Sequence, residues 1–243
     1  MSTLDLVLDR GVLRVAVAYT PPPEEGSHPE FYLHPKTGEP SGVVCELSRI
    51  MAGELGVRPE FVDLAWSQHM KALLDDDVDL LMSYTNTPER ALRVDFAGPL
   101  LPSDIVVMVR NEGGIESTAA LDEPSSCIGV EKGSSIVRVA QRHFSRARVL
   151  ESTSPAPALK NGEFDAWLTD AVTRIFMKQN PELRLLREPG GRLLVLAREY
   201  GHPAVRQNDP RFLNWVRNWL QYHTAQGTID YWCREYWFSW MAD

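Results

Sequence analysis

The stretch at residues 83–96, SYTNTPERALRVDF, holds the residue types best suited to binding a small anion. Thr87, Pro88 and Glu89 form a helix-start signal, because Thr is a good N-cap, Pro fits the first helical position and Glu suits the positive end of the helix dipole. Arg90 follows in that first turn, so free backbone N–H groups and a guanidinium would lie together. We expect this turn to bind a carboxylate or a phosphate. The alternative is an N-capped surface turn with a solvated arginine.

A short apolar strand is expected to position this turn. The run VDLLMS at residues 78–83 is bounded by three aspartates, which is typical of a buried parallel strand. Open α/β sheets bind ligands beyond the carboxyl ends of their strands, where this turn would lie. Strand patterns at 12–18 and 57–64 and helix patterns at 42–56 and 67–74 precede it. The first hundred residues therefore predict a β-α-β-α-β unit with a mostly parallel sheet.

A second, smaller α/β unit is predicted from the middle of the chain. Its strands are expected at residues 127–130, 147–151, 164–169 and 183–187, and its helices begin near residues 134, 154 and 171. A β run at 192–198 then returns, and two helices with aromatic faces, 210–226 and 228–238, end the chain. These aromatic residues are expected to pack in the core, and the alternative is a partner surface. The long loop at 19–40 is of a length that usually has a function or is disordered.

Composition excludes several classes of protein. The chain has 243 residues and a formal net charge of −8, which argues against a nucleic-acid partner. No apolar run reaches the roughly 18 residues of a membrane span, and the first residues do not form a signal peptide. The chain is thus expected to be cytoplasmic, or an exported protein without its leader. Cys45, Cys127 and Cys233 are far apart, so we expect buried thiols, one disulfide being possible, and no metal or cofactor.

With these patterns in view, the chain resembles the periplasmic solute-binding proteins of amino-acid uptake systems, which have the type II periplasmic binding-protein fold. The resemblance is carried by motifs in the family's order along the whole chain. They are GVLRVAV at 11–17, Phe31 before Gly42, GVVCEL at 42–47, TPERALRVDFAGPL at 87–100, GVEKGSS at 129–135, NGEFDAWLTD at 161–170, YGHPAV at 200–205 and a terminal helix with Gly227. The TPER and DAWLTD runs are the most specific of them.

The resemblance implies an α/β fold of two lobes, each a mostly parallel sheet flanked by helices. Lobe 1 would contain residues 1–103 and 197–243, and lobe 2 residues 104–196. Two extended strands near residues 101–107 and 193–197 would form the hinge, and an amino acid would be held between the lobes. The family also implies a monomer in the periplasm that delivers its ligand to the membrane subunits of an ABC transporter.

Family roles for the two ends of an amino acid carry over onto matching positions. Arg90 would bind the ligand α-carboxylate, together with the backbone N–H groups of Thr85 and Ser135. Asp170 would accept the α-ammonium, helped by a backbone carbonyl near Ser83. This is chemically coherent, because a zwitterion needs a fixed cation and a fixed anion a few ångströms apart, and exclusion of water strengthens both interactions.

Further roles concern the ligand's side chain. Phe31 and Trp66 would sandwich it, although both could be ordinary core aromatics. Thr169 could exchange one hydrogen bond with a polar group. Ala18 stands where binders of basic amino acids place an acid, so Lys or Arg would be bound only if an acid at 24–25 folds in. We therefore expect a neutral or modestly polar amino acid.

Each assigned residue also has a structural alternative. Asp170 could be the N-cap of a helix that starts at Ala171, and Ser135 could be only a helix cap. The spacing from Asp79 to Arg90 is one residue shorter than in the family, which leaves the register of residues 83–85 open.

The chief rival function is an enzyme on the same fold. Cyclohexadienyl dehydratases resemble these binding proteins and act on prephenate or arogenate, which requires a general acid. The residue one turn after Asp170 is Thr173, so Asp170 itself, Glu24 or Glu25 would have to serve. Hydrolase and P-loop motifs are absent from the sequence, and its histidines are scattered.

Overall fold

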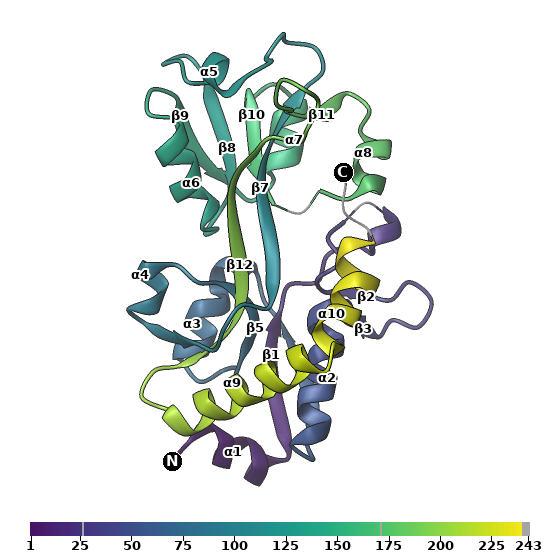
Figure 1. Cartoon of the computed structure of the whole chain (residues 1–243), viewed down its shortest axis with the longest axis vertical. Helices are drawn as coiled ribbons and strands as arrows, with labels where there is room; N and C mark the ends of the chain where they lie inside the picture. Colours follow the sequence, from purple (N-terminus) through teal and green to yellow (C-terminus); the bar gives the residue numbers. More distant parts are fainter. Residues whose placement is uncertain (26, 171, 240–243) are drawn as a thin grey trace. The chain divides into compact units, whose positions relative to one another are not determined.

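The three-dimensional structure is a computed structural model that describes residues 1–25, 27–170 and 172–239 (Figure 1). No helix in these ranges is long and apolar enough to cross a membrane. The three cysteines are free and buried.

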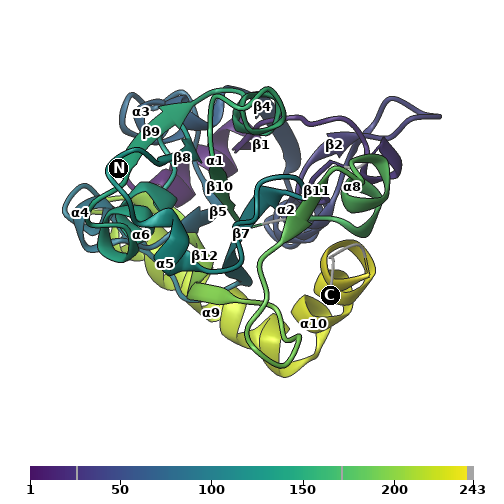
Figure 2. The same ribbon diagram turned by 90° about the horizontal axis from the view of Figure 1, so that it is seen from above.

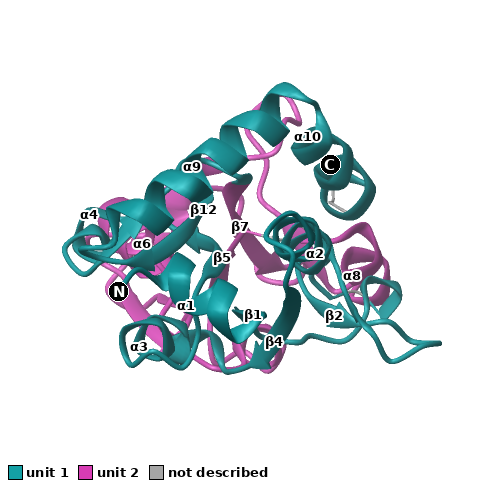
Figure 3. Cartoon of the chain, turned by 90° about the horizontal axis from the view of Figure 1, so that it is seen from below, with its two compact units in different colours: residues 1–102, 200–241 teal, residues 103–199, 242–243 magenta. Residues whose placement is uncertain are grey.

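The described chain forms two compact units, coloured separately in Figure 3. Unit 1 contains Met1–Pro102 and residues 200–239, and unit 2 contains Ser103–Glu199. Strands β7 (Leu101–Arg110) and β12 (Val195–Arg206) each start in one unit and end in the other. The polypeptide therefore passes between the units twice, and unit 1 is built from both ends of the chain.

Unit 1 has a parallel pair of strands at its centre. Strand β1 (Val12–Val17) pairs in parallel with β4 (Arg58–Asp63), and a parallel bridge between Val15 and Leu80 brings in the residue before β5 (Leu81–Thr85). The second half of β12 pairs antiparallel with β5 and with β6 (Val94–Phe96). Unit 1 also contains a separate antiparallel pair, β2 (Tyr32–Leu33) and β3 (Pro40–Ser41), and the short 3-10 helices η1 (Pro23–Glu25) and η2 (Trp66–Gln68). The predicted β-α-β-α-β order is present, and the predicted strand at 78–83 begins at Leu81.

Helices cover this sheet, and both ends of the chain contribute them. They are α1 (Thr3–Arg10), α2 (Val43–Glu54), α3 (His69–Leu74), α4 (Pro88–Ala91), α9 (Pro210–Ala225), α10 (Thr228–Cys233) and the π-helix η3 (Arg234–Phe238). Helix α9 contacts α1, and α10 contacts α2 (Figures 1 and 2). The sequence reading missed α1, although Ser2 caps its start by accepting from the Leu4 N–H and Gly11 ends it at φ 69°.

In the described residues of unit 2, five strands and the first part of β12, which neighbours β7, form one sheet with a hydrophobic core on each face. The order of the five strands is β11 (Leu183–Leu185), β7, β10 (Ala166–Thr169), β8 (Cys127–Glu131) and β9 (Arg148–Ser152), with β8 parallel to both of its neighbours. Helices α5 (Thr118–Leu121), α6 (Ile136–His143), α7 (Pro155–Lys160) and α8 (Arg174–Gln179) flank it. Alternation along β8 sends Ile128 and Val130 into one core and Cys127 into the other.

Two helices begin later than the sequence predicted. Helix α8 begins at Arg174 and is capped by Thr173, which accepts from the Phe176 N–H, so Asp170 is not its N-cap. The helix expected at 67–74 begins at His69, and Ser67 lies inside η2, which has no side-chain cap. By contrast, the predicted Thr87–Pro88 start of α4 is confirmed, because the Thr87 hydroxyl accepts from the Arg90 N–H at 3.2 Å.

Candidate functional site

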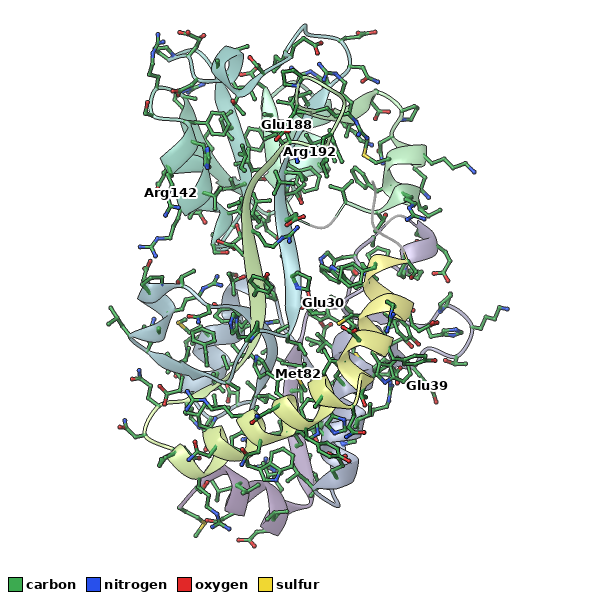
Figure 4. The ribbon with its side chains drawn as sticks, in the orientation of Figure 1. Glu30, Glu39, Met82, Arg142, Glu188 and Arg192 are labelled. Atoms are coloured by element: carbon green, nitrogen blue, oxygen red, sulfur yellow. The ribbon has the colours of Figure 1, made fainter. Side chains whose placement is uncertain are left out.

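Four aromatic rings gather in unit 1, next to the carboxyl ends of β1 and β5. The rings of Phe31 and Trp66 are nearly parallel, with centroids 6.5 Å apart and planes at 28°. Trp66 also packs against His69 at 4.9 Å and against Tyr84 at 5.4 Å. Phe31 is buried, whereas Trp66 is half-buried. Glu30, the residue before Phe31, is labelled in Figure 4. The two predicted sandwich residues are therefore together, and His69 and Tyr84 join them.

Arg90 extends from α4 toward the end of β5. Its side chain is buried, its Nη1 donates to the Thr85 carbonyl at 3.1 Å, and its guanidinium lies 4.0 Å from the Tyr84 ring centroid. The ring supplies a cation–π contact, and the carbonyl orients the guanidinium plane. Burial, opposed by the charge of Arg90, raises the pKa of Tyr84, so this phenol is neutral. Arg90 is thus a cation held in one orientation, which is what recognition of a carboxylate requires.

Ser83 and Thr85 lie on β5, where β12 passes close by. Thr85 pairs with Gly201, and a Cβ at Gly201 would lie 2.2 Å from the Ser83 hydroxyl oxygen. Glycine at 201 therefore allows the close approach of β12 to Ser83. Both predicted residues are half-buried and adjoin Tyr84, which anchors Arg90.

In unit 2, Asp170 directly follows β10. Its Oδ2 accepts a hydrogen bond of 2.7 Å from the Ser103 hydroxyl, and the residue is half-buried. One carboxylate oxygen is thereby oriented by Ser103, at the edge where the carboxyl ends of the parallel strands β8 and β10 meet. Thr169, the last residue of β10, is buried.

Ser135 stands at the start of α6 in the same unit. It is buried, and its hydroxyl donates to Glu199 Oε2 at 2.5 Å. It makes no side-chain cap to the helix, so the alternative that Ser135 is only a capping residue is not supported. The hydroxyl of the preceding residue, Ser134, is buried and has no hydrogen-bond partner in the described chain.

Sequence reasoning missed Glu131, the last residue of β8. The β8–β10 register pairs Ala166 with Ile128 and Trp167 with Gly129, so its continuation by two residues places Glu131 beside Thr169. Because side chains alternate along a strand, Glu131 lies on the same face of the sheet as Gly129. A Cβ at Gly129 would lie 2.1 Å from the Phe164 ring, so glycine leaves room for that ring.

The environment of Glu131 disfavours the charged form of its carboxyl. Burial of the carboxyl, and second the negative charge of Asp170, raise the pKa of Glu131. The residue as a whole is exposed, so its carboxyl is only partly removed from water. Only the pairing of β8 with β10 brings Glu131 near these residues, and the single sequence carries no signal of that pairing.

A cavity in unit 2 lies elsewhere. It measures about 600 Å³ and is lined by residues 116–118 and by residues between 184 and 194. Arg184 in its wall bonds to Glu116 and to the Ile115 carbonyl, and Glu188 pairs with Arg192 (Figure 4). None of the predicted site residues lines it. Within the described chain, no group of three or more His, Cys, Asp or Glu side chains could hold a metal ion.

These features define a class of protein: a mixed α/β fold of the type II periplasmic binding-protein kind, with a buried arginine in unit 1 and an oriented aspartate in unit 2. Residues 24–239 match the family model described as bacterial extracellular solute-binding proteins, family 3. The chain belongs to this family.

Individual relatives include both binding proteins and an enzyme. A cyclohexadienyl dehydratase from Pseudomonas aeruginosa is 24% identical over 247 residues, covering 97% of this chain and 88% of the enzyme. The crystal structure of an ancestral amino-acid-binding protein, described as a precursor of cyclohexadienyl dehydratase, is 28% identical with a TM-score of 0.80, covering 97% of this chain and 99% of that one. A proposed ABC-transporter binding component from Wolinella succinogenes, solved with lysine, is 27% identical with a TM-score of 0.78, covering 96% and 97% of the two chains.

Proposed function

We propose that the protein binds an amino acid and delivers it to the membrane subunits of an ABC transporter. Arg90 in unit 1 binds the α-carboxylate, together with the backbone N–H groups of Thr85 and Ser135. Asp170 in unit 2 accepts the α-ammonium, together with a backbone carbonyl near Ser83. The observation that carries the proposal is the buried Arg90 guanidinium, oriented by the Thr85 carbonyl and the Tyr84 ring. Membership of the solute-binding family supports it.

The test is binding of free amino acids to the purified protein. Native mass spectrometry of protein purified without refolding would detect a retained ligand, and a thermal shift panel would rank the common amino acids. A ligand at one hundred times its Kd should add about 2.7 kcal/mol of stability. Arg90→Lys keeps the charge but loses the fork, and Asp170→Asn removes the charge, so each should weaken binding at least tenfold.

Arg93→Lys is the matched control, because Arg93 is exposed and lies three residues from Arg90. It should leave the Kd within twofold of the wild-type value. If R90K and D170N bind every amino acid as tightly as R93K does, the proposed site is wrong.

The ligand class follows from the groups beside Asp170. Thr169 offers a hydroxyl, and Glu131 offers a carboxyl that feels the charge of Asp170. We propose a neutral or polar amino acid whose side chain donates a hydrogen bond to this pair, with Phe31 and Trp66 against its apolar part. A panel in which only Lys and Arg bind would contradict this ligand class, and it is a sharp test because one relative was solved with lysine.

A second candidate function is a dehydratase that acts on prephenate or arogenate. The sequence showed no acid one turn after Asp170, but the structure places Glu131 at the end of the neighbouring strand with a raised pKa. A carboxyl that stays protonated closer to neutral pH is suited to act as a general acid. Consumption of prephenate that is lost in Glu131→Gln, without binding of any amino acid, would establish the enzyme instead.

The remaining parts of the proposal concern the whole protein. We infer that it acts as a monomer in the periplasm or at the outer face of the membrane, as expected for its family. Light scattering at micromolar concentration should give the mass of one 27.4 kDa chain with and without ligand.

A further inference from the structure

His69 lies at the centre of the unit 1 aromatic group and was not assigned a role from the sequence. It is the first residue of α3, and only 2% of it is exposed. Its ring packs against Trp66 with centroids 4.9 Å apart, and against Phe31 at 6.4 Å. Trp66 itself lies in the three-residue helix η2, where no side-chain cap fixes the backbone.

Two main-chain carbonyls determine how the His69 ring is held. Its Nε2 lies 3.3 Å from the Val17 oxygen at the end of β1 and 3.2 Å from the Leu64 oxygen just after β4. Carbonyl oxygens only accept hydrogen bonds, so Nε2 carries the hydrogen and donates to both. The ring is thus bound to the adjacent ends of the two parallel strands, which are the most regular part of unit 1.

The ring is also neutral. Burial lowers the pKa of His69 below its ordinary 6.5, against the smaller opposing effects of the Leu64 and Val17 carbonyls and of the charge on Asp63. A neutral imidazole can pack against apolar rings without the cost of burying a charge. His69 therefore combines a polar anchor on the strands with a tilted ring contact to Trp66, whose plane lies at 50° to its own.

The spacing of Phe31 and Trp66 makes this anchor relevant to ligand. The two rings lie at 28° to each other with centroids 6.5 Å apart, so the position of each ring determines the space beside the other. A small rotation or shift of the Trp66 ring would alter this spacing. Without His69, the half-buried Trp66 would keep its ring contacts with Phe31 and Tyr84 and its packing against the unit 1 core, but would lose its nearest ring neighbour.

We propose that His69 is a positioning residue: bound to Val17 and Leu64, it fixes the Trp66 ring opposite Phe31. Its importance for ligand rests on the proposed amino-acid-binding function, whereas the positioning of Trp66 does not. The role belongs to this side chain, because it needs both an N–H donor for the carbonyls and a neutral ring in contact with Trp66.

The variants separate these two properties. His69→Leu keeps an apolar side chain of similar size and removes the donor, whereas His69→Gln retains an N–H that can reach the carbonyls. The matched control is His223→Gln, since His223 is also buried, packs on a tryptophan, Trp219, at 4.6 Å, and lies on α9. Thermal melts establish that each variant is folded.

The first readout needs no ligand. The difference in fluorescence between each protein and its Trp66→Phe counterpart isolates the Trp66 signal, and acrylamide quenching measures how exposed the ring is. We expect H69L to raise quenching of the Trp66 signal at least twofold, H69Q to restore most of the protection, and H223Q to leave the signal unchanged. Equal quenching in H69L and wild type would overturn the proposal.

The second readout is a double-mutant cycle on amino-acid affinity. H69L should weaken binding about tenfold in the wild type and less than twofold in a Trp66→Ala background, because the effect passes through Trp66. If H69L weakens binding equally in both backgrounds, His69 acts on stability alone and the proposal is wrong. If the wild type binds no amino acid, the proposed function fails, while the quenching result still decides the positioning of Trp66.

Discussion

Asp79 offers the sharpest test of how unit 1 is held together. Its side chain is 1% exposed, and the residue lies two positions before β5, the strand that leads to Arg90. It accepts from Arg10, from the Arg14 backbone at 2.8 Å and from the Arg14 guanidinium at 2.9 Å, and Arg206 lies 3.7 Å away. One carboxylate therefore joins α1, β1 and the end of β12.

The cost of Asp79→Asn can be bounded from these contacts. Removal of one partner of a buried ion pair costs about 3–5 kcal/mol, and a hydrogen bond to a charged group contributes about 1.5–3 kcal/mol. The arginines keep part of their hydration, since the side chains of Arg10 and Arg14 are 34% and 21% exposed, and Asn retains one acceptor. We therefore expect a loss of about 2–3 kcal/mol, or a fall in Tm of roughly 4–12 °C.

Urea denaturation followed by both circular dichroism and tryptophan fluorescence would measure this loss. Asp76→Asn is the matched control, because Asp76 pairs with Arg14 and Arg206 but its side chain is 58% exposed. Exposed pairs contribute about 0–1 kcal/mol, and Asn tolerates the φ of 67° at this position. If D79N and D76N lower the free energy of unfolding by the same amount, burial of the Asp79 carboxylate does not increase its contribution to stability.

Three further outcomes are expected. Gly129→Ala should destabilise unit 2 by about 1–3 kcal/mol in urea melts, because the new Cβ would lie 2.1 Å from the Phe164 ring, which must move; an unchanged midpoint would show that the ring yields freely. Thr87→Ala removes the cap that accepts from the Arg90 N–H and should lower the free energy of unfolding by about 1 kcal/mol. It should also weaken ligand binding, and an unchanged Kd would contradict the assigned role of this turn. Burial lowers the pKa of His69, so the folded state keeps the ring neutral while the unfolded chain binds a proton below pH 6.5. Stability should fall as the pH drops through 6.5 toward the folded pKa, and H69L should make this fall smaller, the rest coming from His202, whose pKa burial also lowers; an unchanged fall in H69L would contradict the assignment.

Local signals in the sequence predicted several elements well. The Thr87–Pro88 start of α4 followed from cap chemistry between neighbouring residues, and it is confirmed. The start of α8 was misplaced because Asp170 and Thr173 are both good N-caps, and the sequence does not show that Ser103, 67 positions away, hydrogen-bonds to Asp170. Helix α1 was missed although its capping residues, Ser2 and Gly11, were visible.

The parts of the candidate site that sequence reasoning missed depend on distant contacts. Nothing near Glu131 indicates that its strand lies beside β10, so its proximity to Thr169 follows only from sheet register. A histidine at position 69 looked unremarkable until the carbonyls of Val17 and Leu64 were placed beside it. Site roles that depend on such pairings stay predictions until binding is measured.

The discontinuous unit 1 sets an order in which the chain can fold. Unit 2 is one uninterrupted segment, Ser103–Glu199, whereas the start of α9 must return to the N-terminus: Asp209 accepts from the Ser2 hydroxyl at 2.6 Å and from the Thr3 backbone. During synthesis, unit 2 can therefore close while α1, β1 and β4 still lack α9. Closing a loop of this length is entropically costly and slow. The emerging N-terminal half thus exposes apolar surface until the last part of the chain arrives, and substitutions in α9 should affect yield of folded protein more than they affect ligand affinity.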